Sequence, residues 1–165
     1  FLAAAAGDSR IIIGTAAGVR DLSEDHKPYL PAERSRIESL GGRVLFRGVP
    51  RVQGILSVSR SLGDVHLKPF VAAEPRVVEG LLGNENDYAV LACDGVWDVL
   101  TSAHVMALVR EAGTANEAAR RVMNTSLDSG STDNITVIVL DLRPFTATLH
   151  RAAMEVLSST DFAFT

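Results

Sequence analysis

An unbroken apolar run that ends in an acidic turn constrains this sequence more than any other feature. The run extends from Tyr88 to Cys93 and is followed directly by Asp94 and Gly95. Because no polar face alternates with the apolar one, the run is typical of a strand buried on both faces. Glycine permits a sharp turn, so we expect Asp94 to be presented at the edge of a sheet.

A second acidic position precedes the last strongly apolar segment. Asp133 stands just before a predicted strand over residues 135–142. If this strand and the 88–93 run are antiparallel neighbours, the end of one lies beside the start of the other. Asp94 and Asp133 then meet at one edge, where two carboxylates repel each other unless a cation or a proton lies between them. Hard oxygen ligands of this kind favour Mg²⁺, Mn²⁺ or Ca²⁺ over Zn²⁺.

Each acidic position also has a purely structural interpretation. Asp-Gly at a strand end is usually a turn, and Asp133-Asn134 before a strand can form an Asx-turn. Asp8 lies in the Gly7-Asp8-Ser9 turn of a predicted hairpin that joins strands over residues 2–6 and 10–15. Structural carboxylates are common, so each position taken alone favours the structural interpretation.

The rest of the pattern predicts mixed α and β structure with largely antiparallel pairing. Short strands are expected within residues 44–58 and 71–78. A short helix should begin at Pro31 and end at Gly41-Gly42, and its predicted buried face is Ala32, Ile37 and Leu40. Later helices are predicted from the cap Thr101 to Gly113, over residues 116–127 and over residues 146–157, the last with Leu149, Ala152, Ala153 and Val156 on one face.

Composition narrows the class of protein. The chain has 165 residues, 47% hydrophobic and 22% charged, with a net charge of −4, which is typical of a globular domain without a basic surface for nucleic acid. No apolar run approaches the ~20 residues of a membrane helix, so neither nucleic acid nor a membrane is an expected partner. The single cysteine, Cys93, cannot form an internal disulfide, which favours an intracellular, cytoplasmic protein. We interpret Cys93 as a buried strand residue and Trp97 as core packing.

Several short motifs occur together in a fixed order. They are Gly7-Asp8-Ser9-Arg10, Ser23-Glu24-Asp25-His26-Lys27-Pro28, Arg51-Val52-Gln53-Gly54, Ser59-Arg60-Ser61-Leu62-Gly63-Asp64, Cys93-Asp94-Gly95-Val96-Trp97-Asp98 and Asp133-Asn134-Ile135-Thr136. In order and spacing, from about Ala3 to Leu142, the set resembles the metal-dependent protein phosphatase family, often called type 2C. The resemblance assigns residues 1–142 to the C-terminal portion of one phosphatase domain and leaves 143–165 as a helical extension.

The resemblance implies an α+β fold, a β-sandwich of mainly antiparallel strands flanked by helices, with metals at one end. It implies that Asp94 and Asp133 bind a central pair of Mg²⁺ or Mn²⁺ ions and that Asp8 faces a third ion. Asn134 and Asp98 match supporting positions beside the metals. The implied reaction is hydrolysis of phosphoserine and phosphothreonine in phosphoproteins by a metal-activated water, so no side chain acts as the nucleophile.

The resemblance also has gaps. The family's N-terminal half carries an acidic motif, an Asp-Gly-His motif and a phosphate-binding arginine, and the sequence contains no Asp-Gly-His. We therefore expect residues upstream of Phe1 to be missing, and residues 1–165 alone to bind metal weakly and hydrolyse little. The alternative is a catalytically inactive phosphatase-like domain that binds or regulates partners.

Residues 43–54 fall where the family has a mobile flap. If these residues form a flap, they should affect substrate choice more than chemistry. The competing interpretation is an ordinary β-connection.

Overall fold

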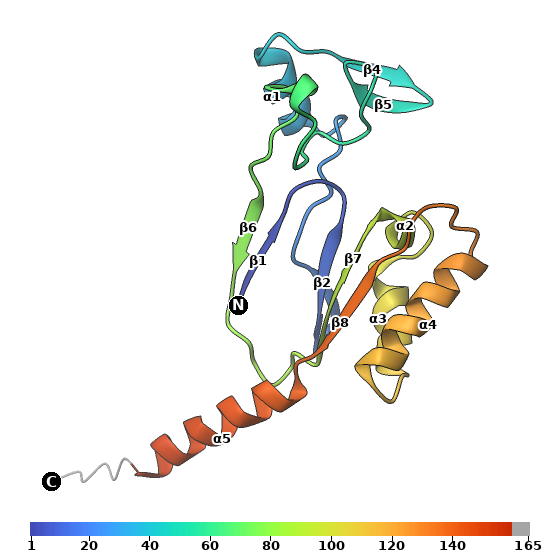
Figure 1. Cartoon of the computed structure of the whole chain (residues 1–165). Helices are drawn as coiled ribbons and strands as arrows, with labels where there is room; N and C mark the ends of the chain where they lie inside the picture. The colour runs from blue at the N-terminus through green and yellow to red at the C-terminus, as the bar shows by residue number, and fades with distance from the viewer. Residues whose placement is uncertain (160–165) are drawn as a thin grey trace, which may run out of the picture.

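A four-stranded antiparallel sheet forms the centre of the computed structural model, which describes residues 1–159 (Figure 1). Helices cover one face of this sheet, and a two-stranded sheet lies over the other. The neighbouring strands, all antiparallel, are β3 (Gly18–Asp21), β2 (Arg10–Thr15), β7 (Tyr88–Ala92) and β8 (Val137–Asp141). This arrangement confirms the α+β class with mainly antiparallel strands.

The two-stranded sheet corrects the predicted hairpin. β1 (Leu2–Ala5) pairs with β6 (Arg76–Glu79) and not with β2. Both edges of β2 are already occupied, by β3 and β7, so β1 has no edge of β2 to join. The chain instead turns at Gly7, where φ is +114°, and passes from one layer of the sandwich to the other.

The helical face holds the main core. It is formed by α2 (Asp94–Trp97), α3 (Ser102–Arg110) and α4 (Ala115–Asp128), which pack against β2, β7 and β8. The fully buried aliphatic side chains of this core are Ile12, Val90, Val96, Val105, Val109 and Val122. Burying each side chain of this size contributes about 1.5–3 kcal/mol. The hydroxyl of Thr101 accepts a hydrogen bond from the backbone of His104, which confirms the predicted cap of α3.

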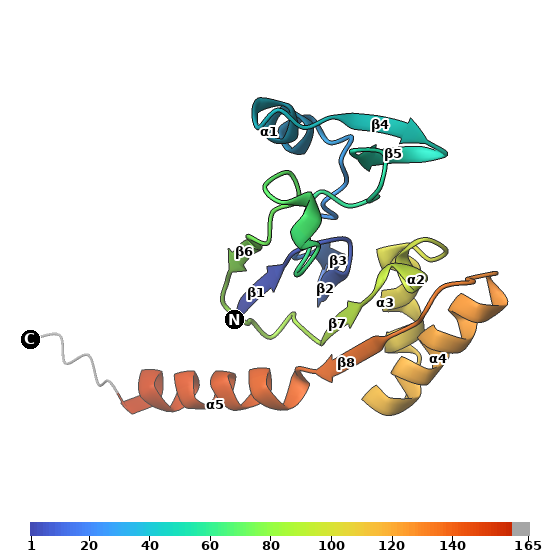
Figure 2. The ribbon, with the colours of Figure 1, turned by 45° about the horizontal axis from the view of Figure 1, so that its top comes forward.

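A smaller unit lies at one end of the sandwich, and we call it the flap unit (Figures 1 and 2). It contains α1 (Pro31–Ser39), the hairpin of β4 (Val44–Arg47) and β5 (Val49–Val52), and the short 3₁₀ helix η1 (Val65–Leu67). Its separate core consists of Ile37, Val52, Leu67 and Val71. Of the face predicted for α1, only Ile37 is buried, whereas Ala32 and Leu40 are exposed.

The last helix, α5 (Arg143–Ser159), points away from the sandwich (Figure 2). Phe145 and Leu149 are exposed, and so is Ala152, so these described residues do not form the predicted buried face. The side chains of Ala153 and Val156 lie outside the described residues. In the part of the chain that the structure describes, no helix combines the length and the apolar character that spanning a bilayer requires. The proposed division of the chain after residue 142 stays a prediction.

Candidate functional site

The ends of β7 and β8 bring the two predicted acidic turns together. Ala92, the last residue of β7, pairs with Val137, the first residue of β8. Because the strands are antiparallel, Asp94 follows one strand at the same edge at which Asp133 precedes the other. The juxtaposition expected from the apolar run is therefore present.

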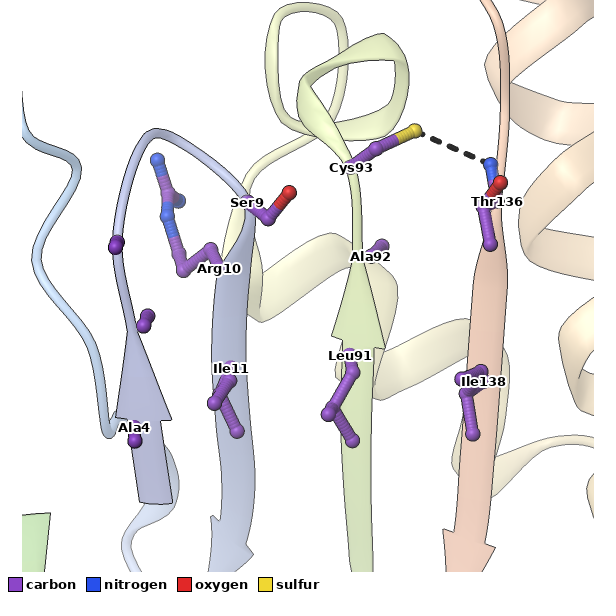
Figure 3. Close-up of a pocket in the computed structure, with 11 residues that line it drawn as sticks. Ala4, Ser9, Arg10, Ile11, Leu91, Ala92, Cys93, Thr136 and Ile138 are labelled. Carbon is purple, nitrogen blue, oxygen red and sulfur yellow. Dashed lines mark hydrogen bonds between the residues drawn. The ribbon is translucent and has the colours of Figure 1, made fainter. Parts of the chain in front are cut away.

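Hydrogen bonds fix the two turns to each other. The backbone N–H of Cys93 donates to the carbonyl of Thr136 at 3.2 Å, and its thiol accepts from the backbone N–H of Thr136 at 3.1 Å (Figure 3). The same thiol donates to the carbonyl of Asn134 at 3.0 Å. The hydroxyl of Ser131 donates to the carbonyl of Gly95 at 2.6 Å. Cys93 is thus half-buried and hydrogen-bonded, in contrast to the buried strand residue that we predicted.

We predicted that Gly95 allows a sharp turn, but the structure shows that its lack of a side chain allows close packing instead. It lies within α2, and a Cβ atom added to it would be 2.3 Å from the carbonyl oxygen of Asn134. No side chain fits at that distance. Glycine at this position allows the two turns to approach each other.

Asp8 joins the same edge from the turn between β1 and β2. Two contacts hold this turn: the backbone N–H of His26 donates to the carbonyl of Gly7 at 2.9 Å, and the N–H of Gly7 donates to Nδ1 of His26 at 3.2 Å. The carboxylate of Asp8 pairs with the ammonium of Lys27 at 2.5 Å. Burial lowers the pKa of Lys27, but the bond to Asp8 and the charges of Asp8 and Asp98 outweigh it and raise this pKa above the ordinary value.

The charges of these carboxylates act on Asp94. Partial burial raises the pKa of Asp94, and the negative charges of Asp8, Asp133 and Asp98 raise it further, in that order. The backbone N–H of Gly95 opposes these effects. We call the group Asp8, Asp94, Asp98 and Asp133 the acidic edge. The predicted supporting residue Asn134 is exposed beside it and contributes its backbone carbonyl to the contacts between the turns.

A second cation, Arg10, is held firmly beside the acidic edge. Its guanidinium donates to both carboxylate oxygens of Asp25, at 3.0 and 2.8 Å, and lies 5.1 Å from the ring centroid of Trp97. Trp97 is buried, and its indole N–H donates to the carbonyl of Ala92 at 2.7 Å, so its role as core packing is confirmed. No role was predicted from the sequence for Arg10, Lys27 or Ser131. Arg10 and Lys27 lie inside the recognised motifs, which was a signal for them, whereas Ser131 lies outside the motifs, two residues before Asp133.

The donor atoms of the acidic edge fit a hard divalent cation. They are carboxylate oxygens that repel one another, and Mg²⁺ and Mn²⁺ prefer such ligands. Among the residues whose side chains the structure describes, however, no three acidic, histidine or cysteine side chains are arranged so that they could hold an ion by themselves. The chemistry therefore fits the metal, whereas a complete site needs further ligands. The metal-ligand roles of Asp94, Asp133 and Asp8 stay predictions.

A cavity of about 400 Å³ lies below the acidic edge, between the two sheets (Figure 3). Ile11, Leu91 and Ile138 form its apolar floor, and Ser9 and Cys93 lie toward the edge. None of the carboxylates of the acidic edge lines it. The chemistry of the acidic edge and the space of this cavity are therefore separate features.

A sequence profile described as Protein phosphatase 2C matches residues 1–135. The chain belongs to the protein phosphatase 2C family. "Probable protein phosphatase 2C 76" of Arabidopsis thaliana is 43% identical over 137 residues, which are 83% of this chain and 33% of that relative. "Probable protein phosphatase 2C 7" of Oryza sativa subsp. japonica is 43% identical over 156 residues, 94% of this chain and 40% of the relative.

Solved structures of two other proteins share the fold. A phosphatase from a pathogenic strain of Toxoplasma gondii has a TM-score of 0.76 and 38% identity, and the match covers 84% of this chain and 47% of that one. A C. elegans sex determining protein has a TM-score of 0.81 and 30% identity. That match covers 86% of this chain and 36% of the other chain. The family predicted from the motifs is confirmed. The chain spans about a third to two fifths of the curated relatives described here.

Proposed function

We propose that this chain forms the acidic-edge part of a protein serine/threonine phosphatase that depends on Mg²⁺ or Mn²⁺. The observation that carries the proposal is the mutual repulsion at Asp94, whose pKa is raised by burial and then by Asp8, Asp133 and Asp98. Such a group is stable only with a proton or a cation among its members. Membership of a family of metal-dependent phosphatases makes a divalent cation the better choice.

In this proposal, the acidic residues of the chain would hold the cations, and neighbouring residues fix the positions of the acidic turns. When bound, two divalent cations and a third beside Asp8 would activate a water and withdraw charge from the phosphoryl group. Asp94 and Asp133 are proposed to hold the central pair, and Asp8, with Asp98 nearby, would hold the third ion. Ser131 and Cys93 keep the two turns at a fixed separation. No side chain of the acidic edge is required as a nucleophile, so we expect no phosphoenzyme.

Phosphoserine and phosphothreonine in proteins are the proposed substrates, and the flap unit is proposed to select among them. The hairpin of β4 and β5 is exposed at its tip, where Phe46 is 77% exposed. An intracellular, cytoplasmic site of action is proposed from the single cysteine alone.

The test uses the longest form of the protein that is expressed, because the relatives are longer than this chain. Phosphate release from phosphoserine and phosphothreonine peptides is measured during a Mn²⁺ titration. Asp94→Asn and Asp133→Asn should each lower kcat/KM by roughly 100-fold or more, since loss of even outer-shell support of a metal costs 10–100-fold. Asp128→Asn, at the exposed end of α4, is the matched control and should leave the rate unchanged.

A catalytically inactive binding domain is the competing function. It predicts that Mn²⁺ binds to the protein without any release of phosphate. A Mn²⁺-saturated protein that releases none from a broad phosphopeptide library would reject the enzymatic proposal. Trapping of a phosphorylated protein side chain would reject the proposed route through water.

A further inference from the structure

The ammonium of Lys27 stands at a carboxylate that is predicted to face a metal ion. It lies 2.5 Å from Oδ2 of Asp8. The two side chains are 24% and 17% exposed, so the pair is shielded from much of the solvent. One positive charge inside the chain therefore already neutralises one member of the acidic edge.

The two cations beside the acidic edge are bound in different ways. Arg10 has a bidentate bond to Asp25, a further bond to Ser102 at 3.1 Å and a contact with the ring of Trp97. In the described part of the chain, the ammonium of Lys27 has a single hydrogen-bond acceptor, Asp8. A lysine side chain is flexible and carries a point charge, whereas an arginine fork in two bonds is fixed. Lys27 can therefore leave its partner by rotation of its own side chain, and Arg10 cannot.

The backbone around Lys27 stays in place when the side chain moves. His26 is buried, and its backbone N–H and carbonyl bond to Gly7 and to the N–H of Ser59 at 2.9 and 2.8 Å. The backbone N–H of Lys27 itself bonds to the carbonyl of Asp25 at 2.9 Å. The backbone of Lys27 is thus anchored through His26 to the turn that carries Asp8, and only the ammonium end can change its partner.

We propose that Lys27 is a built-in counter-cation that competes with a divalent cation for Asp8. The proposal rests on the proposed metal chemistry of the acidic edge. Without metal, the ammonium reduces the repulsion among Asp8, Asp94 and Asp98. When a divalent cation binds Asp8, the ammonium leaves the carboxylate and points to solvent. The ion with which Asp8 interacts therefore binds more weakly than its oxygen ligands alone would allow.

Two measurements on the longest expressed form test this competition. The first is Mn²⁺ binding, followed by the EPR signal of free Mn²⁺ and by calorimetry. Lys27→Met keeps the aliphatic stem and removes the charge, and it should tighten the weakest class of Mn²⁺ sites by about 10-fold, because a unit charge ~4 Å away in a partly shielded site acts with an energy of this order. Lys27→Arg should restore weak binding. In the background of Asp8→Asn, Lys27→Met should have no effect on that class.

The second measurement is thermal unfolding without metal. Lys27→Met should lower Tm, because Asp8 loses its counter-charge, and saturating Mn²⁺ should remove most of that deficit. Arg20→Met is the matched charge control: Arg20 is exposed on β3, so its loss changes the net charge equally without releasing Asp8. It should change neither the weak Mn²⁺ class nor the metal-free Tm appreciably.

Several results would overturn the proposal. Unchanged Mn²⁺ affinity in Lys27→Met would do so, as would an equal gain in Arg20→Met, which would show a general charge effect. A gain that persists with Asp8→Asn would show that Asp8 is not the shared ligand. If the binding results are as expected and no phosphate is released, the competition stands and the proposed phosphatase activity fails. Absence of Mn²⁺ binding at millimolar metal would overturn both.

Discussion

The guanidinium of Arg60 donates to both carboxylate oxygens of Glu33, at 2.6 Å from Nη2 and 3.2 Å from Nε. Arg36 adds a bond to the same carboxylate at 2.9 Å. The Glu33 side chain is only 6% exposed, although it lies on a surface helix. Since Glu33 lies on α1 and Arg60 lies between β5 and η1, this buried ion pair holds α1 against the segment that follows the β4–β5 hairpin.

Glu33→Gln should destabilise the protein at neutral pH. Burial raises the pKa of Glu33, but the bonds from Arg60 and Arg36 outweigh it and hold this pKa at about 2, below the ordinary 4.5. A shift of this size corresponds to about 3 kcal/mol of unfolding free energy. Urea unfolding followed by circular dichroism should show a loss of roughly that amount. Glu38→Gln is the control, because Glu38 pairs with Arg34 on the exposed surface and should change stability by less than ~1 kcal/mol.

The same shift predicts a dependence of stability on pH. A carboxyl group whose pKa is depressed in the folded state stabilises the fold above its unfolded pKa and loses this contribution as pH falls toward its folded pKa. The contribution of Glu33 is therefore complete above about pH 4.5 and disappears toward pH 2. The unfolding free energy of the wild type should fall more steeply than that of Glu33→Gln over this interval. Parallel curves for the two proteins would contradict the role of the pair.

Gly95→Ala should separate the two turns of the acidic edge. The new methyl group would be 2.3 Å from the carbonyl of Asn134, and backbone at that distance must move. We expect a loss of about 1–3 kcal/mol in stability, as for an overpacked core, together with weaker Mn²⁺ binding. Chemical denaturation and Mn²⁺ calorimetry measure the two effects. Gly113→Ala is the control, because its methyl would meet only the flexible carboxylate end of Glu117 at 3.0 Å; equal behaviour of the two variants would refute the argument from close approach.

A polypeptide of residues 1–165 should bind hydrophobic dye and self-associate. Ile138 and Leu140 are 51% and 47% exposed on the face of β8 that points away from the helices, beside cavities of about 400 and 320 Å³. Exposed apolar surface of this kind drives association. Replacing both residues by Thr, which keeps strand propensity, should lower dye fluorescence and the mass measured by light scattering. Leu81→Thr, at a position that is 93% exposed and lines neither cavity, should leave both unchanged.

Phe46→Ala tests the flap as a determinant of substrate choice. Phe46 is exposed at the tip of the β4–β5 hairpin, so it can contact a protein substrate without touching the acidic edge. We expect KM for a phosphopeptide to rise about 5-fold, while kcat for a small aryl phosphate stays unchanged. Val49→Ala, on the other face of the hairpin, is the matched control. If replacement of residues 43–54 from a relative leaves peptide selectivity unaltered, the interpretation as an ordinary β-connection is correct.

The local parts of the fold could be predicted from the sequence. The run that forms β7 and the Thr101 cap of α3 depend on neighbours along the chain, and both were found where expected. The partner of β1 could not be predicted, because alternation says that a strand exists but not which distant strand it joins. Burial of Glu33 was missed for a similar reason: the charge that permits it, Arg60, comes from another segment of the chain.

The acidic residues of the candidate site could be predicted from the sequence, whereas the contacts of the cations beside them could not. Asp94 and Asp133 could be placed together because antiparallel neighbours share an edge, and the pairing of Ala92 with Val137 has that geometry. The motifs also contained Lys27 and Arg10. Their partners, Asp8 and Asp25, became evident only from the tertiary contacts of the turns.

The pairing of β7 with β8 also has an evolutionary consequence. The segment between these strands contains α3 and α4, and both of its ends lie at the edge of the sheet where Ala92 pairs with Val137. Because Cys93 and Ser131 fix the two ends of this segment to each other, its helices can be lengthened, shortened or exchanged while Asp94 and Asp133 keep their spacing. The outer surface formed by α3 and α4 can therefore change in sequence and length while the acidic edge keeps its geometry.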